Sequence, residues 1–70
     1  MTLAERFGLN LAALRREAGI TQEELAAQAF TSRVVLSRLE NGHALPRLNH
    51  VVSLAEALGV QVRDLLYGIE

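Results

Sequence analysis

The sequence contains no cysteine, no tryptophan and no lysine, and Pro46 is its single proline. Without cysteine, neither a disulfide framework nor a thiolate metal site can stabilise the chain of 70 residues. The two histidines, His43 and His50, are too few and too isolated to form a metal site, so we expect no metal and no cofactor. A compact core must therefore stabilise the domain, and the 50% of residues that are hydrophobic, many of them leucine and alanine, can supply it.

Long hydrophobic runs are also missing. No stretch is long enough to cross a membrane, and the N-terminus lacks the basic region and apolar run of a signal peptide. We therefore expect a soluble cytoplasmic protein without a membrane partner. The chain also has no recognisable nucleophile–base pair, metal cluster or phosphate-cradling glycine loop, and so small a domain leaves little room for a pocket. Neither an enzyme nor a small-molecule receptor is expected.

Positive charge is concentrated in one part of the chain, although the net charge is −1. Residues 33–50 hold three arginines and one glutamate, whereas the other positions hold four arginines and seven acidic residues. All seven basic residues are arginine, which either suits bidentate recognition of phosphate and guanine or reflects the codon composition of a GC-rich genome. The overall charge argues mildly against a nucleic-acid binder, whereas its distribution favours one around residues 33–50.

Apolar residues recur at helical spacing along the chain, and no alternating run or hairpin turn indicates a strand. The sequence therefore predicts an all-α fold with five helices in a single domain, residues 1–70. Capping boxes, in which glutamate follows threonine by three residues, predict where the first two helices begin: Thr2–Glu5 and Thr21–Glu24. The predicted helices span residues 2–18, 22–29, 32–41, 48–58 and 62–67. The apolar stripes of the first and fourth helices comprise Leu3, Phe7, Leu11, Leu14 and Ala18, and Leu48, Val51, Leu54, Ala55 and Leu58.

The helix predicted at residues 32–41 has two chemically different faces. At about 100° per residue, one face carries Val35, Leu36, Leu39 and Glu40, and the other carries Arg33, Val34, Ser37, Arg38 and Asn41. A helix that displays two arginines, a hydroxyl, an amide and one methyl-bearing side chain can read base edges in a DNA groove. It is a poor site for bond-making chemistry.

Three segments resemble the phage repressor and Cro type of helix-turn-helix domain, the XRE family, in the right order and spacing. They are LRREAGITQEELA (residues 14–26), SRVVLSRLENG (residues 32–42) and LAEALGVQVRDLL (residues 54–66). The resemblance implies a five-helix lambda-repressor-like fold and sequence-specific binding to double-stranded DNA, usually as a homodimer on a palindromic, two-fold operator. It also implies a bacterial or phage-encoded regulator of transcription. Compact members of the family include controllers of restriction-modification systems, phage regulators and antitoxins.

The resemblance also implies roles for individual side chains. The family's base-facing positions are held by Arg33, Val34, Ser37 and Arg38, and its phosphate-facing positions by Gln22, Ser32, Asn41, His43 and Arg47. Which arginine reads a base and which a phosphate stays open, and Val34 is either an ordinary surface valine or a contact for a thymine methyl group. Arg15 and Glu40 match a pair that forms a semi-buried salt bridge in the family. Helix geometry agrees, because Arg15 flanks the apolar stripe whereas Arg16 points to solvent.

Phe30 departs from the family, which usually has glycine at this turn because a left-handed backbone is easy only without a Cβ atom. We expect either a different turn geometry or a ring that fills a gap in the core.

Apolar residues crowd the C-terminal end of the chain in excess of what one short helix need bury. Either this hydrophobic face wraps the domain's own core or, as the resemblance implies, it forms a homodimer interface. The predicted interface residues are Val60, Val62, Leu66 and Tyr67. The low net charge keeps a second function open, that of a protein-binding module such as an antitoxin whose apolar surface covers a toxin. Repression and activation of transcription are both compatible with the sequence.

Overall fold

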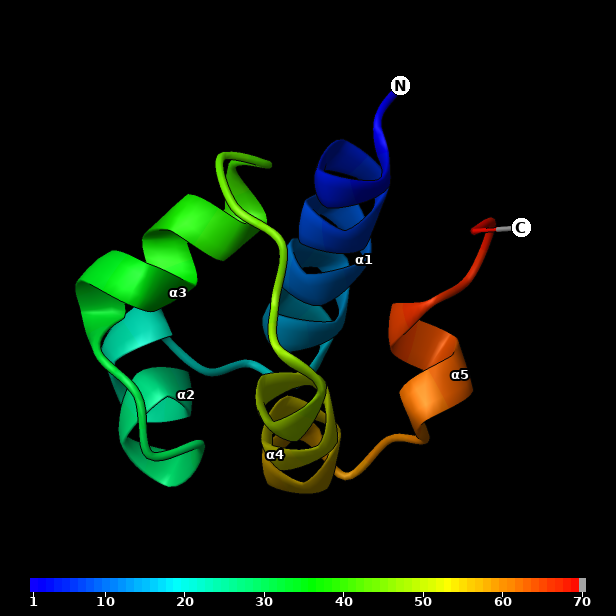
Figure 1. Ribbon diagram of the computed structural model, residues 1–70. Helices are drawn as coiled ribbons and strands as arrows, with labels where there is room; N and C mark the ends of the chain where they lie inside the picture. The colour runs from blue at the N-terminus through cyan, green and yellow to red at the C-terminus, as the bar shows by residue number, and fades with distance from the viewer. Residues whose placement is uncertain (70) are drawn as a thin grey trace.

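The computed structural model describes residues 1–69 and contains five helices, which confirms the predicted all-α fold. Figure 1 shows α1 near the centre, with α2 and α3 on one side of it, α5 on the other and α4 below. None of the helices within residues 1–69 is long and apolar enough to span a membrane. The five are α1 (Leu3–Glu17), α2 (Gln22–Gln28), α3 (Arg33–Glu40), α4 (Leu48–Leu58) and α5 (Val62–Leu65).

Side-chain caps begin α1 and α2 where the sequence predicts them. The Thr2 hydroxyl accepts a hydrogen bond from the Glu5 backbone N–H at 3.1 Å, and the Glu5 carboxylate accepts one from the Thr2 backbone N–H at 2.8 Å. Thr21 and Glu24 form the same reciprocal pair, at 3.1 and 2.9 Å. Each pair satisfies two backbone donors that the first turn of a helix would otherwise leave without partners.

Four of the five helices are shorter than predicted, and α1 spans Leu3–Glu17 instead of residues 2–18. Ser32 is the N-cap residue of α3, since its hydroxyl accepts a hydrogen bond from the Val35 backbone N–H at 3.1 Å, and Asn41 is the C-cap residue. The α2 helix ends at Gln28, and α5 ends at Leu65 instead of residue 67. The helices predicted from apolar spacing include such cap residues, because the spacing of side chains does not show where the backbone hydrogen bonds of a helix stop.

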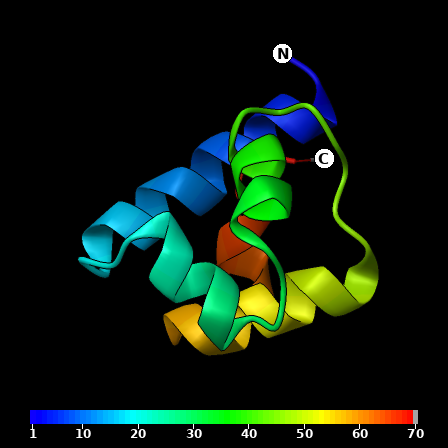
Figure 2. The same ribbon diagram turned by 90° about the vertical axis from the view of Figure 1, so that its left-hand side faces the viewer.

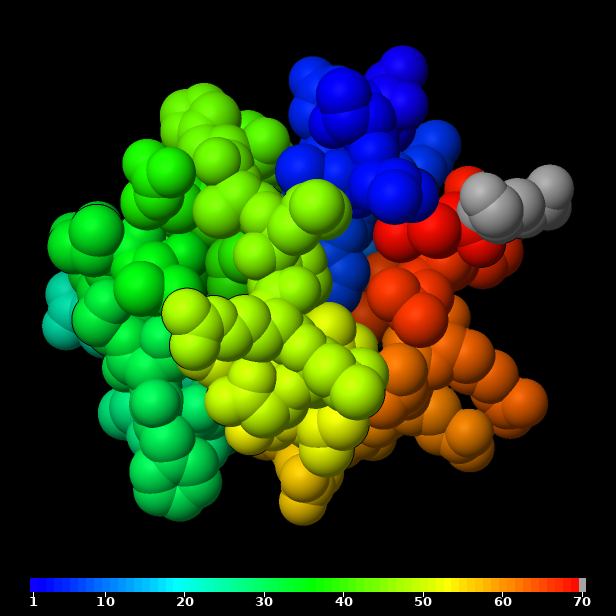
Figure 3. Space-filling view, viewed as in Figure 1, coloured from blue at the N-terminus to red at the C-terminus, as the bar shows by residue number. Residues whose placement is uncertain are grey.

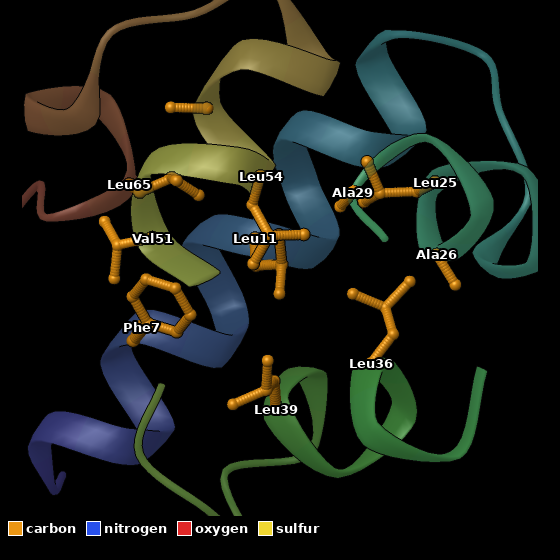
Figure 4. Packing of buried hydrophobic residues seen from close by; sticks show 11 residues of the cluster. Phe7, Leu11, Leu25, Ala26, Ala29, Leu36, Leu39, Val51, Leu54 and Leu65 are labelled. Atoms are coloured by element: carbon orange, nitrogen blue, oxygen red, sulfur yellow. The ribbon is translucent and has the colours of Figure 1, made fainter. Parts of the chain in front are cut away.

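The core is formed by side chains from all five helices. In the packing, α1 lies against α3 and α5, and α4 lies against α2 and α5. Figure 4 shows Leu11 in the middle of this cluster, beside Leu54. The largest fully buried side chains are Phe7, Leu11, Leu25, Leu36, Leu54 and Leu65. Because every helix contributes at least one of them, the position of α3 on the surface depends on the whole domain.

The α1 and α3 helices approach each other closely at Gly8. A Cβ atom at this position would lie 2.4 Å from the Leu39 carbonyl oxygen and 2.6 Å from the Glu40 carbonyl oxygen. Any other residue would push the two helices apart, which would be destabilising. Gly8 therefore sets how deeply α3 is seated on the domain.

Several residues assigned to buried faces are exposed instead. Leu3 and Leu48 are 55% and 78% exposed, and both border an apolar hollow that no part of residues 1–69 covers. Ala18 is the exposed C-cap residue of α1, and Val35 lies at the edge of the buried face of α3. The spacing identifies the inward face of a helix, but it does not show how far the neighbouring helices extend over that face.

Both expectations for Phe30 are wrong. Its backbone adopts the left-handed conformation that glycine favours, with φ of 57°, and its side chain is 91% exposed. Two hydrogen bonds at the end of α2 hold this turn: Phe30 N–H donates to the Ala27 carbonyl at 3.3 Å, and Thr31 N–H donates to the Ala26 carbonyl at 2.9 Å. The helix end thus imposes the usual turn geometry in spite of the Cβ atom.

Candidate nucleic-acid interface

The outer face of α3 is exposed and carries positive charge. Figure 2 shows α3, in green, at the front of the molecule, with α2 beside it and α1 behind. Val34 is 70% exposed, although it is apolar. The structure brings the four predicted base-reading residues together around one shallow hollow on this face: Arg33, Val34, Ser37 and Arg38.

Hydrogen bonds order the C-terminal part of this face. Arg38 Nη2 donates to the His43 carbonyl oxygen at 3.3 Å, which ties the α3 face to the following loop. The Asn41 side-chain amide donates to the Ser37 hydroxyl at 3.4 Å. Gly42 follows with φ of +73°, and the His43 backbone N–H closes the helix end on the Arg38 carbonyl at 2.9 Å. The side chains that could reach DNA from this end are therefore partly ordered without DNA.

A largely buried network of polar side chains holds the C-terminal end of α3 against α1 and α2. Arg15 Nε and Nη2 donate to the two carboxylate oxygens of Glu40 at 2.6 and 3.2 Å, and Arg15 Nη1 donates to the Ile20 carbonyl at 3.0 Å. The hydrogen bond to Glu40 raises the pKa of Arg15 above its ordinary value, and burial opposes this effect. With side chains only 13% and 5% exposed, Arg15 and Glu40 form the salt bridge that joins α1 to α3.

Gln22 belongs to the same network. Its side-chain amide donates to Glu40 Oε1 at 3.0 Å, so the first residue of α2 is tied to the last residue of α3. An amide nitrogen carries two hydrogens. Gln22 can therefore keep Glu40 as a partner while its second N–H remains available to another acceptor.

The other predicted phosphate contacts lie around the ends of α3 and α4. The hydroxyl of Ser32 caps the start of α3, as described above, and Asn41 and His43 lie at its end. Arg47 is the N-cap residue of α4 but makes no side-chain capping hydrogen bond, so its exposed guanidinium is not used to cap the start of this helix. Together with Gln22, these residues surround the α3 face on the chain segments that flank it.

A second surface feature is an apolar hollow of about 340 Å³ between the two ends of the described chain. Figure 3 shows it where the blue start of α1, the yellow-green loop before α4 and the red C-terminal segment meet. Leu45, Leu48 and Leu66 are exposed around it, although each is a large hydrophobic residue. The lining residues are Leu3, Phe7, Leu45, Pro46, Leu48, Val51, Val62, Leu66 and Ile69.

The four predicted dimer-interface residues do not lie on one surface of the structure. Val62 and Leu66 line the apolar hollow, whereas Val60 packs against the core. Tyr67 is exposed but lies in a different depression, beside Asp64 and α1. Leu45, which was not among the predicted interface residues, is 64% exposed and also lines the hollow.

Asn10 is a structural residue that sequence reasoning also missed. Its side-chain amide donates to the Leu65 carbonyl at 2.9 Å and to the Tyr67 carbonyl at 2.8 Å. Both hydrogens of the amide are thus used to hold the end of α5 against α1. This contact orients the C-terminal segment that contributes Leu66 to the apolar hollow.

Comparisons with known proteins identify the family. An uncharacterized HTH-type transcriptional regulator (y4dJ) from Sinorhizobium fredii is 42% identical, and the match covers 94% of this chain and 86% of the relative. The HTH-type transcriptional regulator DdrOP3 from Deinococcus deserti is 41% identical, and the match covers 100% of this chain and 51% of the relative. The chain thus spans most of the first relative and about half of the second.

Solved structures of regulators have the same fold. The clp gene regulator ClgR from Corynebacterium glutamicum is 35% identical with a TM-score of 0.90, and the match covers 94% of this chain and 86% of ClgR. The restriction-modification controller protein C.AhdI from Aeromonas hydrophila is 32% identical with a TM-score of 0.87, with 89% and 90% of the two chains covered. Residues 11–65 match the Helix-turn-helix (HTH_3) family. The chain therefore belongs to this XRE-type helix-turn-helix family, and the relatives described above are transcriptional regulators.

Proposed function

We propose that the protein is a sequence-specific regulator of transcription that binds double-stranded DNA as a homodimer on a two-fold operator in the cytoplasm. The observation that carries this proposal is the hollow on the exposed face of α3, which is lined by two arginines, a serine and a valine. This combination matches the donors, acceptors and methyl groups that base pairs present in the major groove. The segments that flank α3 add polar side chains suited to the DNA backbone.

The proposed contacts fall into two classes. Arg33, Val34, Ser37 and Arg38 read bases, and a bidentate arginine–guanine pair is worth about 1–3 kcal/mol of discrimination. The contacts to phosphates come from the ends of the motif helices and from the following loop: Gln22, Ser32, Asn41, His43 and Arg47. Phosphate contacts fix the register of the protein on DNA, and they make affinity depend on salt.

The proposed dimer interface is the apolar hollow and its exposed rim. Leu45, Leu48 and Leu66 supply the contiguous apolar surface that a monomer would otherwise leave in water. In a dimer that binds a two-fold operator, the two α3 helices would have to lie about 34 Å apart, at half-sites one DNA turn apart. Bound at a promoter, such a dimer would repress transcription by steric exclusion of polymerase. Activation would require a further contact between the dimer and polymerase.

The same apolar hollow favours a second candidate function, a module that covers a partner protein, as an antitoxin does. This alternative also fits the net charge of −1. It differs from the first proposal in two measurable ways, since it predicts a stable hetero-complex and only weak DNA binding by the protein alone.

In vitro selection of random duplex DNA by the purified protein, at physiological salt, separates the two functions. Enrichment of a palindrome with half-sites about one helical turn apart is expected for the dimeric regulator. Binding that is weak, sensitive to salt and without enrichment would instead favour the protein-binding module.

A further inference from the structure

Val34 is the one large apolar side chain on the outer face of α3, and it is 70% exposed among Arg33, Ser37 and Arg38. Residues four apart on a helix lie on the same side, so Val34 and Arg38 form one row of this face, and Arg33 and Ser37 form the other. The hollow lies among these four side chains. Its apolar wall is therefore Val34, and the remaining walls are polar.

Arg38 lines this hollow and is also bonded to the loop that follows α3. Its Nη2 donates to the carbonyl oxygen of His43 at 3.3 Å, which holds the guanidinium at the C-terminal end of the helix. One donor is used in this bond, and four of the five guanidinium N–H groups stay available. A guanidinium held in this way loses less conformational freedom on binding than a free one.

From this arrangement we infer that Val34 and Arg38 together read a 5-methylpyrimidine next to a guanine, and that 5-methylcytosine can take the place of thymine there. Arg38 forms the bidentate pair with the guanine O6 and N7 atoms, and the methyl group at C5 of the neighbouring pyrimidine enters the hollow against Val34. The inference rests on the proposed DNA-binding function, and it adds that affinity for the operator responds to cytosine methylation.

The chemistry of valine is the reason that the two pyrimidines are equivalent. Thymine presents an O4 acceptor and cytosine an N4 donor, but valine forms no hydrogen bond with either group. Val34 therefore detects the C5 methyl group alone, which thymine and 5-methylcytosine share and which cytosine lacks. If the pyrimidine lacks the methyl group that is buried against Val34, affinity is expected to fall about fourfold. For two half-sites the loss is about 15-fold.

The experiment uses the operator obtained by selection and measures affinity at fixed salt for duplexes that differ by single methyl groups. Replacing the contacted thymine by deoxyuridine in both half-sites is expected to weaken binding about 15-fold. Replacing the contacted thymine by cytosine, with guanine opposite, is expected to weaken binding. Methylation of this cytosine at C5 is expected to raise affinity again by about 15-fold. A Val34→Ala variant should lose both responses, whereas Val52→Ala, a change at an exposed valine of α4, should retain them.

The outcomes separate this inference from the proposed function. Two results would overturn the inference while leaving the DNA-binding function intact. In the first, the protein binds the deoxyuridine duplex as tightly as the thymine duplex. In the second, the selected palindrome contains no guanine next to a pyrimidine with a C5 methyl group. Methyl responses that persist in Val34→Ala would also overturn it. If the wild-type protein shows no sequence preference, the proposed function fails first, and the inference fails with it.

Discussion

The guanidinium of Arg15 and the carboxylate of Glu40 meet at 2.6 Å between α1 and α3, and both side chains are largely buried. This pair lies on the inner side of α3, opposite the face that carries Arg33 and Arg38. The orientation of that outer face therefore depends on an interaction that does not touch it.

Replacing Arg15 by methionine is expected to lower the free energy of unfolding by about 3 kcal/mol, because the Glu40 carboxylate would remain buried without its ionic partner. Chemical denaturation measures this change. Arg16→Met is the matched control at the next, exposed position, and it should change stability by less than about 0.5 kcal/mol. The double variant with Glu40→Met should recover part of the loss, since no buried charge is then left alone. Equal effects of the two single variants would contradict a structural role for Arg15.

Phe30→Gly is expected to stabilise the fold by about 1 kcal/mol, because glycine relieves the steric strain of the left-handed backbone and no buried contact is lost with the exposed ring. Phe30→Ala is the control, since it removes the ring but keeps the Cβ atom, and it should give no comparable gain. Urea unfolding midpoints of the three proteins provide the comparison. A glycine variant no more stable than the alanine variant would show that the turn is not strained.

Leu48→Glu is expected to weaken the proposed homodimer about 100-fold, because each subunit would lose an exposed leucine of the apolar hollow that the proposed interface would bury. Sedimentation equilibrium gives the dissociation constants. Leu9→Glu is a suitable control, because Leu9 is also an exposed leucine but does not line the hollow. If both variants dimerise like the wild type, the two-fold interface lies elsewhere on the molecule.

Arg38→Ala is expected to remove discrimination at one base pair of each half-site, about 1–3 kcal/mol, with the fold unchanged. Arg47→Ala should instead weaken binding to all sequences about equally and reduce the salt dependence by about one phosphate contact. Competition binding with mutated operators distinguishes these two patterns. An unchanged sequence preference in Arg38→Ala would remove this residue from the base-reading set.

The stability of the protein is expected to fall in acid partly through Glu5. Its hydrogen bonds with Thr2, mainly with the backbone N–H and secondly with the side chain, lower the pKa of the Glu5 carboxyl below its ordinary value. A lowered pKa means that the charged form favours the folded state, so this contribution is present above about pH 4.5 and is lost as the pH falls through the folded-state pKa. NMR titration should place the Glu5 midpoint below that of an unfolded peptide. The pH dependence should shrink in Glu5→Gln, because glutamine caps without titrating.

The amino-acid sequence by itself determined the helices, their beginnings and the composition of the α3 face. The reason is that these features are local. A capping box such as Thr2–Glu5 involves residues three apart, and the row of Val34 and Arg38 follows from the helical repeat alone. Even the left-handed turn at Phe30 could have been inferred by trusting the local motif over the preference of one residue.

Only the tertiary structure decided which apolar residues remain in water and that Asn10 meets the end of α5. Leu3, Leu48 and Leu66 form one hollow because the starts of α1 and α4 lie beside the C-terminal segment, and this juxtaposition has no sequence periodicity. The bonds of Asn10 to the Leu65 and Tyr67 carbonyls span 55 and 57 residues. Such contacts depend on where whole helices end and how closely they pack, and spacing along one helix carries no information about either.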